Sequence, residues 1–388
     1  MPKIAIVAGE ASGDLLGGHL IRALKAKRSD LTFVGIAGPK MMAEGAKSLF
    51  SIEKLSVRGY VEVLKHLYGL LKLRRSLLKQ LLAEKPDIFI GVDAPDFNFW
   101  LERKLKKRGI STIHYVSPSI WAWRGGRMSK IKRAVSHMLA LLPFEPALYE
   151  KAGVPVTFIG HPLADELPLR PNKAAARNML KIEKNKLVVV MLPGSRQSEV
   201  EQHADLFVKT AQIISQDNTN TQFQNIQFLV PLITRETRQI FETALYKNLH
   251  DKNVYDSLAL DILFGHAHDA MEAADVVLVA SGTATLEAAL LKRPMVITYR
   301  MPTLSWWILK YMNYLPYVGL PNILAGKFVV PELLQKDATP QKLADAVSLL
   351  LVDRNRTQEI KQEFTDIHQA LKQNSAKKAA EVVLNYLK

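Results

Sequence analysis

The chain has 388 residues, of which 48% are hydrophobic, so it can form two domains of ordinary size, each with its own core. The formal net charge of +15 indicates an anionic partner: a nucleic acid, an anionic membrane surface or a phosphorylated substrate. The absence of cysteine excludes disulfides, thiolate metal sites and cysteine nucleophiles.

Short apolar runs alternate with helical patterns along the whole chain. The first half predicts strands at Lys3–Ala8, Thr32–Ala37, Ile88–Val92 and Thr112–Val116, with a helix at Leu15–Lys27. The second half predicts strands at Leu187–Leu192, Gln227–Val230, Val276–Val279 and Met295–Thr298. Strands that alternate with helices form parallel sheets, so the pattern predicts an α/β protein with two Rossmann-like domains and C-terminal helices.

The Pro-rich segment Ile159–Arg177 breaks regular structure and marks the join between the two halves. We expect a first domain over residues 1–165, a second over residues 166–345, and helices over residues 346–388. These helices can cross back to the first domain of the same chain or to that of a partner in a homodimer, and both alternatives stay open.

Two loops at the ends of predicted strands in the first half are candidates for a site. Gly9, Ser12 and Gly13 lie between the first strand and a helix, where main-chain N–H groups can bind a phosphate or part of an acceptor. The alternative is a plain turn with a helix cap. Asp93 and Asp96 follow the strand Ile88–Val92, and a carboxylate there can act as a general base. We favour Asp93 because it is nearer the strand end, although both can be helix caps.

The segment HYVSPSIWAWR, residues 114–124, also follows a strand. Trp121 and Arg124 suit a sugar, a base or the entrance for an acyl chain. The alternative is a hydrophobic contact between sheet and helix. His114, within the strand, is more typical of a buried core histidine.

The second half contains two further loops of this kind. Ser195 and Arg196 follow the strand Leu187–Leu192 and can bind a diphosphate, or Arg196 can form a surface ion pair with Glu199 or Glu201. A second loop opens an apolar helix and can hold phosphate at the helix start. Its candidate residues are Ser281, Gly282, Thr283, Thr285 and Glu287. Glu287 can accept hydrogen bonds from a ribose, and Thr283 or Thr285 can be the N-cap.

Two apolar surfaces are candidates for lipid contact. Tyr60–Leu82 is typical of an amphipathic helix, or of two helices with a break near Gly69, with a basic second face that an anionic membrane would attract. The alternative is a core helix with a solvated face. The cluster around Trp306 and Trp307 can be core, an acyl-chain pocket or an interface.

Taken together, these segments resemble the lipid-A-disaccharide synthase family along essentially the whole chain. The segments that carry the resemblance are IAIVAGEASGD, FVGIAGPKM, GVDAPDFN, HYVSPSIWAWR, FIGHPLAD, LPGSRQSEVE, ASGTATLEAAL and LPNILAG. The resemblance implies a B-type glycosyltransferase fold, with two facing Rossmann-like domains and the active site between them. It also implies transfer of 2,3-diacylglucosamine from UDP-2,3-diacylglucosamine to 2,3-diacylglucosamine 1-phosphate, with neither metal nor cofactor.

The mechanism expected from these residues is a single inverting displacement. Asp93 is the base, while Arg196, Ser195 and the helix start at residues 281–285 stabilise the departing UDP. Glu287 holds the ribose. Asn322, in LPNILAG, is a further donor contact or a helix cap.

The resemblance further implies a peripheral enzyme on the cytoplasmic face of the inner membrane of a Gram-negative bacterium. No stretch is long and apolar enough to span a bilayer, and the N-terminus is typical of a strand and not of a signal peptide. One alternative is a transferase or epimerase of the same fold that acts on a soluble UDP-sugar. Another is a basic nucleic-acid-binding protein, but no recognition helix or aromatic–basic platform supports it.

Overall fold

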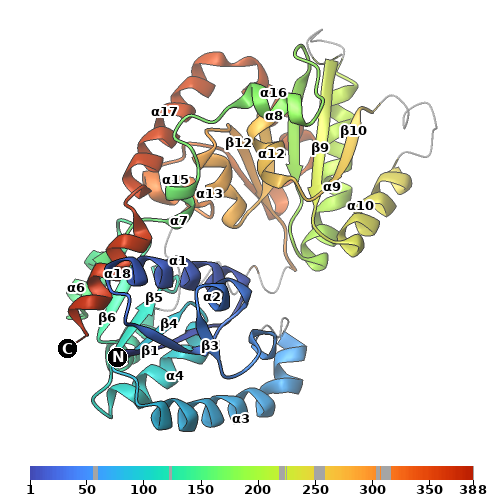
Figure 1. Ribbon diagram of the computed structural model, residues 1–388. Coiled ribbons are helices and arrows are strands. Elements are labelled where there is room, and N and C mark those ends of the chain that lie inside the picture. The colour runs from blue at the N-terminus through green and yellow to red at the C-terminus, as the bar shows by residue number, and fades with distance from the viewer. Residues whose placement is uncertain are drawn as a thin grey trace. The chain divides into compact units, whose positions relative to one another are not determined.

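The computed structural model describes residues 1–55, 60–121, 125–217, 223, 225–248, 258–302, 306 and 316–387. The chain forms two compact units (Figure 1): residues 1–165 with 370–388, and residues 166–369. Each unit contains its own parallel sheet. Among the described residues, no helix has the length and apolar character that crossing a bilayer requires.

The first unit is built on a seven-stranded sheet in the order β3-β2-β1-β4-β5-β6-β7. Its strands are β1 (Lys3–Ala8), β2 (Thr32–Ile36), β3 (Ala46–Ser48), β4 (Ile88–Val92), β5 (Ser111–Tyr115), β6 (His137–Ala140) and β7 (Val156–Phe158). Neighbouring strands are parallel throughout. The carboxyl ends of β1 and β4 are therefore adjacent, because these two strands pair directly.

Helices cover this sheet. They are α1 (Ala11–Lys27), α2 (Pro39–Ala43), α3 (Tyr60–Glu84), α4 (Pro95–Lys106), α5 (Met128–Ala134), α6 (Glu145–Lys151), α7 (Pro162–Glu166) and α18 (Ser375–Asn385). The last of these, α18, packs against α1, and Lys27 forms an ion pair with Glu381 at 2.9 Å. The C-terminal segment thus completes the unit that the N-terminus begins. Helix α3 continues through Gly69, so the alternative of two helices is wrong.

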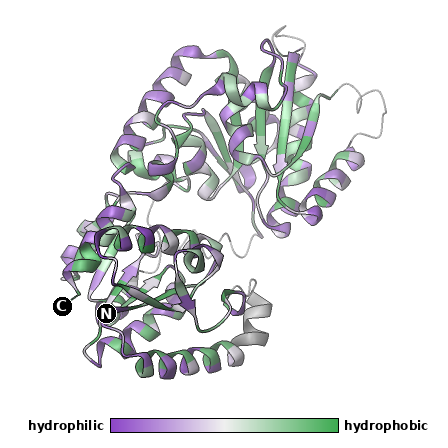
Figure 2. Ribbon diagram, in the orientation of Figure 1, coloured by the Kyte–Doolittle hydropathy of each residue, from purple (hydrophilic) through white to green (hydrophobic). Residues whose placement is uncertain are grey.

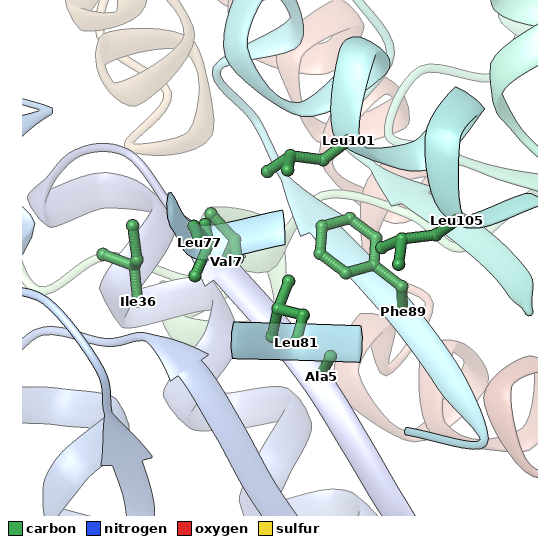
Figure 3. Packing of buried hydrophobic residues seen from close by; sticks show 8 residues of the cluster. All are labelled: Ala5, Val7, Ile36, Leu77, Leu81, Phe89, Leu101 and Leu105. Carbon is green, nitrogen blue, oxygen red and sulfur yellow. The ribbon is translucent and has the colours of Figure 1, made fainter. Parts of the chain in front are cut away.

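A cluster of fully buried apolar side chains joins α3 and α4 to the sheet (Figure 3). It contains Ala5 and Val7 of β1, Ile36 of β2, Leu77 and Leu81 of α3, Phe89 of β4, and Leu101 and Leu105 of α4. Burying a large apolar side chain is worth about 1.5–3 kcal/mol. This packing fixes the two strands whose ends carry the candidate loops.

The second unit has a six-stranded sheet in the order β10-β9-β8-β11-β12-β13. Its strands are β8 (Leu187–Leu192), β9 (Ile226–Leu232), β10 (Leu260–Phe264), β11 (Val276–Ala280), β12 (Met295–Tyr299) and β13 (Glu332–Leu334). The helices are α8 (Lys173–Met179), α9 (Gln197–Ser215), α10 (Arg235–Asn248), α12 (Ala267–Ala273), α13 (Thr283–Leu290), α15 (Leu320–Ala325), α16 (Pro340–Val352) and α17 (Arg354–Leu371). Figure 2 shows the strands mainly in green and the helices in mixed green and purple, as expected for sheets covered by amphipathic helices.

The predicted fold class, two Rossmann-like units followed by C-terminal helices, is confirmed. Five strands were not predicted: β3, β6, β7, β10 and β13. Four of these lie at sheet edges, where one side of the strand meets solvent and a continuous apolar run is not needed. Of the C-terminal helices, α16 and most of α17 belong to the second unit and α18 belongs to the first.

Candidate active site

In the first unit, the loops after β1 and β4 touch each other. A Cβ atom on Gly9 would lie only 2.6 Å from the Cβ of Ala94, so only glycine allows this approach. Gly13, in the first turn of α1, packs on the main chain of Val92. Ser12 is exposed beside them. The structure therefore brings Gly9, Ser12 and Gly13 next to the turn that carries Asp93.

Asp14, which the sequence did not single out, lies in the first turn of α1 and holds the start of α2. Its buried carboxylate accepts hydrogen bonds from the main-chain N–H groups of Gly38 (2.9 Å), Lys40 (2.8 Å) and Met41 (3.0 Å). The first N–H groups of a helix have no partner within that helix, and the Asp14 carboxylate supplies one for those of the short helix α2. The segment AGPKM is thus held against the candidate loop.

Asp93 and Asp96 occupy different environments. Helix α4 has Ala94 as its N-cap and no side-chain cap bond, so the alternative that both carboxylates cap this helix is wrong. Asp96 is 84% exposed and forms an ion pair with Arg127 at 3.0 Å. Asp93 is half-buried, and none of the residues that the structure describes donates a hydrogen bond to its carboxylate. The Asp93 carboxylate can therefore accept a hydrogen bond without breaking a contact within the part of the chain that the structure describes.

Trp121 contacts the protein interior through both its ring and its N–H group. Its Nε1 donates to the Glu145 carboxylate at 3.1 Å, and its ring meets Phe144 edge-on at 5.2 Å. This contact agrees with the alternative in which the loop makes a hydrophobic contact between sheet and helix. Arg124 lies outside the described residues. His114 is fully buried and its Nδ1 lies 2.6 Å from Glu102, so it is a core histidine.

Glu145 is an unpredicted feature of this region. It is 2% exposed and accepts hydrogen bonds from the main-chain N–H groups of Leu141 and Leu142. Burial raises the pKa of Glu145 from 4.5 to about 7, although these hydrogen bonds favour the charged form. The folded state therefore binds a proton at this site more tightly than the unfolded state.

We expect Glu145 to make the stability of the protein fall with rising pH. Its stabilising contribution is complete below pH 4.5 and is lost as the pH rises to about 7. At about 1.4 kcal/mol per pKa unit, the loss is about 3 kcal/mol. Urea unfolding of wild type and Glu145→Gln should give similar free energies at pH 4.5 and favour the variant at pH 8. Glu150→Gln, an exposed change on the same helix, is the control. An equal difference between wild type and Glu145→Gln at both pH values would contradict the assignment.

The second unit contains a pocket of about 440 Å³ at the carboxyl ends of its strands. It lies where β8 and β11, which pair directly, lead into α9 and α13. The pocket is lined by Leu192, Gly194, Ser195, Arg196, Glu199, Pro231, Ile233, Ala267, Met271, Ala280, Ser281, Gly282, Thr283, Ala284, Glu287 and Tyr299. Both predicted loops of the second half therefore meet in one pocket with an apolar part and a part rich in hydroxyl and main-chain donors.

The loop after β8 is held by Glu199. Its carboxylate accepts hydrogen bonds from the main-chain N–H groups of Ser195 (3.0 Å) and Arg196 (3.2 Å). It also forms an ion pair with the Arg196 guanidinium at 3.1 Å, so the surface ion pair expected as the alternative for Arg196 is present. The Arg196 side chain is 69% exposed. An exposed pair of this kind is worth at most about 1 kcal/mol, so an anion in the pocket can compete for Arg196.

The loop after β11 places its main chain at the pocket. Gly282, with φ +153°, is the N-cap of α13, so the prediction of Thr283 or Thr285 as the N-cap is wrong. Ser281, Gly282 and Thr283 line the pocket. Thr285 is buried and its hydroxyl donates to the Gly282 carbonyl at 2.8 Å. Thr285 therefore shapes the loop from within and, unlike Ser281, Gly282 and Thr283, does not line the pocket.

Glu287 faces His268, a residue that the sequence did not single out. Nε2 of His268 lies 3.1 Å from a Glu287 carboxylate oxygen. The hydrogen bond to Glu287 raises the pKa of His268. The flanking residue Ala267 lines the pocket together with Glu287, so the imidazole fixes the carboxylate at the pocket wall.

Two further polar side chains support the second unit from within. Asn322 is fully buried and bonds to the main chain of Val329 and Val330 and to Glu332. It neither lines the pocket nor caps α15, whose N-cap is Gly319. His203 joins α9 to the residue that follows β12: Nδ1 donates to the Glu199 carbonyl (2.7 Å), and Nε2 accepts from the Arg300 N–H (2.9 Å). Burial lowers the pKa of His203, which keeps it neutral in this role.

The chain has the B-type glycosyltransferase fold, because it consists of two parallel α/β units with candidate residues at the carboxyl ends of the strands. The chain is similar to the solved structure of a glycosyltransferase from Rickettsia africae, with a TM-score of 0.58, 12% identity and coverage of 100% of this chain and 98% of the other. It is also similar to a UDP-GlcNAc 2-epimerase from Neisseria meningitidis, with a TM-score of 0.60, 12% identity and 99% coverage of both chains. At these identities the likeness concerns the fold alone.

Sequence comparison identifies the family. The family described as lipid-A-disaccharide synthetase matches residues 4–386. The chain is 64% identical over 388 residues to the lipid-A-disaccharide synthase of Methylobacillus flagellatus, with all of both chains covered. It is 57% identical over 386 residues to that of Azoarcus sp., covering 100% of this chain and 96% of the relative. The chain therefore belongs to the lipid-A-disaccharide synthetase family and is a glycosyltransferase, as the sequence motifs predicted.

Proposed function

We propose that the chain transfers 2,3-diacylglucosamine from UDP-2,3-diacylglucosamine to the 6-hydroxyl of 2,3-diacylglucosamine 1-phosphate. The products are the β-1,6-linked disaccharide 1-phosphate and UDP, in lipid A biosynthesis. The observation that carries the proposal is the pocket of the second unit, which combines an arginine, a helix start and a carboxylate around about 440 Å³. Full-length identity to enzymes named for this reaction supports the choice of substrates.

The pocket suits a UDP-sugar donor because its parts match the chemistry of UDP. The start of α13 at Gly282 and Thr283 presents main-chain N–H groups and a helix dipole to an anion, whereas the N–H of Ser281 donates to the Thr298 carbonyl. Arg196 can add charge-assisted hydrogen bonds to the same diphosphate. Glu287 is placed to accept hydrogen bonds from ribose hydroxyls, and Pro231, Ile233 and Met271 offer an apolar wall for the base.

The proposed reaction is a single displacement with inversion. Asp93 takes the proton from the acceptor hydroxyl, and the oxygen attacks the anomeric carbon. The bond between this carbon and the diphosphate breaks, and its electron pair leaves with UDP. Arg196, Ser195 and the N–H groups at the start of α13 stabilise the charge that grows on the departing oxygen. A single displacement requires no covalent enzyme intermediate. In the described part of the chain, no group of three or more His, Asp or Glu side chains is arranged to hold a metal ion.

We further propose that the enzyme acts on the cytoplasmic face of the inner membrane, as a monomer or as a homodimer. In α3, Leu77 and Leu81 belong to the core, as in the alternative of a core helix with a solvated face. Tyr68 is 79% exposed, and Lys72, Arg75 and Lys79 are exposed on the same helix. Each basic side chain near an anionic bilayer is worth about 1 kcal/mol. The side chains of residues 60–67 and the cluster at Trp307 lie outside the described residues.

Substrate choice is the test that separates this proposal from a same-fold enzyme for soluble sugars. Purified protein in detergent would receive either the two diacylated substrates or UDP-N-acetylglucosamine with N-acetylglucosamine 1-phosphate. We expect disaccharide only from the acylated pair. Turnover of the soluble pair at an equal or higher rate would reject the substrate assignment.

We expect Glu287 to determine the preference for ribose over deoxyribose. A hydrogen bond to a charged group is worth about 1.5–3 kcal/mol, so wild type should bind UDP about 10–100-fold more tightly than 2′-deoxy-UDP. Glu287→Ala should remove most of this preference in calorimetric titrations. Glu242→Ala, on α10 and outside the pocket lining, should retain it. A Glu287 variant with an unchanged ratio would show that the ribose is bound elsewhere.

A further inference from the structure

The turn that carries Asp93 has an unusual backbone conformation. Strand β4 ends at Val92 and α4 begins at Pro95, and both residues between them have positive φ angles, +51° for Asp93 and +44° for Ala94. The left-handed region costs a residue with a side chain about 1–2 kcal/mol. Two such residues in succession persist only where the surroundings hold them in place.

Asn98, one turn into α4, supplies that support. Its side chain is fully buried, and its Nδ2 donates to the Asp93 carbonyl at 2.8 Å. The same Nδ2 lies 3.4 Å from the Val7 carbonyl and 3.5 Å from the Val92 carbonyl. One amide thus joins the end of β1, the end of β4 and the turn itself.

The packing around Asn98 leaves its amide little room to move. A Cβ atom on Gly91 would lie 2.9 Å from the Asn98 Cβ and 2.3 Å from a Glu102 carboxylate oxygen. Glu102 in turn contacts Nδ1 of His114 at 2.6 Å, and both are fully buried. On the other side of the turn, Gly9 approaches Ala94 too closely to carry a side chain.

We infer that Asn98 is a positioning residue, whose amide holds the Asp93–Ala94 turn in its left-handed conformation and so directs the Asp93 carboxylate toward the acceptor. The inference rests on the proposed role of Asp93 as base. A base misplaced by about 1 Å can cost about 10²-fold in rate. Asn98 acts through Asp93, so its effect must disappear when the Asp93 carboxylate is absent.

A double-mutant cycle on kcat tests this coupling. Asn98→Ala should lower kcat about 30–100-fold while the Kd for UDP, which the second unit binds, stays within about twofold. The double variant Asp93→Ala/Asn98→Ala should turn over within about threefold of Asp93→Ala alone. Asn98→Ser, which keeps a hydroxyl donor, should recover part of the rate and serves as the second variant if Asn98→Ala does not fold.

Two outcomes would overturn the inference while leaving the proposed function intact. The first is a kcat for Asn98→Ala within about threefold of wild type although Asp93→Ala loses about 10²-fold or more. The second is an equal loss of rate from Asn98→Ala in the wild-type and Asp93→Ala backgrounds, which would indicate a general structural role. By contrast, a wild-type rate in Asp93→Ala itself would overturn the assignment of the base and the inference together.

Discussion

Replacing Asp93 with Ala is expected to lower kcat for disaccharide formation by about 10²–10⁴-fold, the usual contribution of a positioned general base. The acceptor hydroxyl would then lose its proton only to water. The affinity for UDP should not change, because every residue that lines the pocket belongs to the second unit, whereas Asp93 belongs to the first. Initial rates at saturating substrates, with calorimetric titration of UDP, measure both quantities on the same preparation.

Asp96 provides the matched control because it is a carboxylate only three residues away. It is 84% exposed and forms an ion pair with Arg127, and surface pairs of this kind contribute little. Asp96→Ala should retain a rate within about threefold of wild type. If Asp96→Ala were inactive and Asp93→Ala active, the roles of the two carboxylates would be reversed.

Replacing Arg196 with Ala is expected to weaken UDP binding by about 10–100-fold, because charge-assisted hydrogen bonds are worth about 1.5–3 kcal/mol. The rate should fall as well, since the same guanidinium stabilises the departing diphosphate. Loss of its exposed ion pair with Glu199 should leave the free energy of unfolding nearly unchanged. Titration of UDP and uridine separates the effects, because only UDP carries the diphosphate, so uridine affinity should be unaffected.

Arg238 is the control for this change. It is also a partly exposed arginine with a carboxylate partner on its own helix, Glu242 at 2.8 Å, but it does not line the pocket. Arg238→Ala should bind UDP as wild type does. Equal weakening by both variants would point to overall charge, and an unchanged affinity in Arg196→Ala would show that the diphosphate is bound without this residue.

The central strands of both units could be predicted from the sequence almost to the residue. Lys3–Ala8, Ile88–Val92 and Leu187–Leu192 have the predicted bounds because strands buried on both faces are continuous apolar runs. β7 and β13 have three residues each and lie at sheet edges. Segments this short carry too little pattern to separate a strand from a loop.

The candidate site was predictable at strand ends and less so within helices. Ser195, Arg196 and Ser281 line the pocket because a parallel sheet brings the ends of its strands together. Thr285 does not, since residues two apart on a helix do not share a face. His268 could not be assigned, because its partner Glu287 is distant in sequence and meets it only in the folded chain. The bond from Asn98 to the Asp93 carbonyl could not be predicted either, because it depends on the left-handed conformation of the turn.

The anomeric configuration of the product tests the central claim most directly. Wild-type protein would be incubated with an α-linked UDP-2,3-diacylglucosamine donor and 2,3-diacylglucosamine 1-phosphate, and the product examined by NMR. We predict a β-1,6-linked disaccharide 1-phosphate with one UDP released per linkage. An α linkage, or release of UDP without any disaccharide, would contradict an inverting transfer to the acceptor.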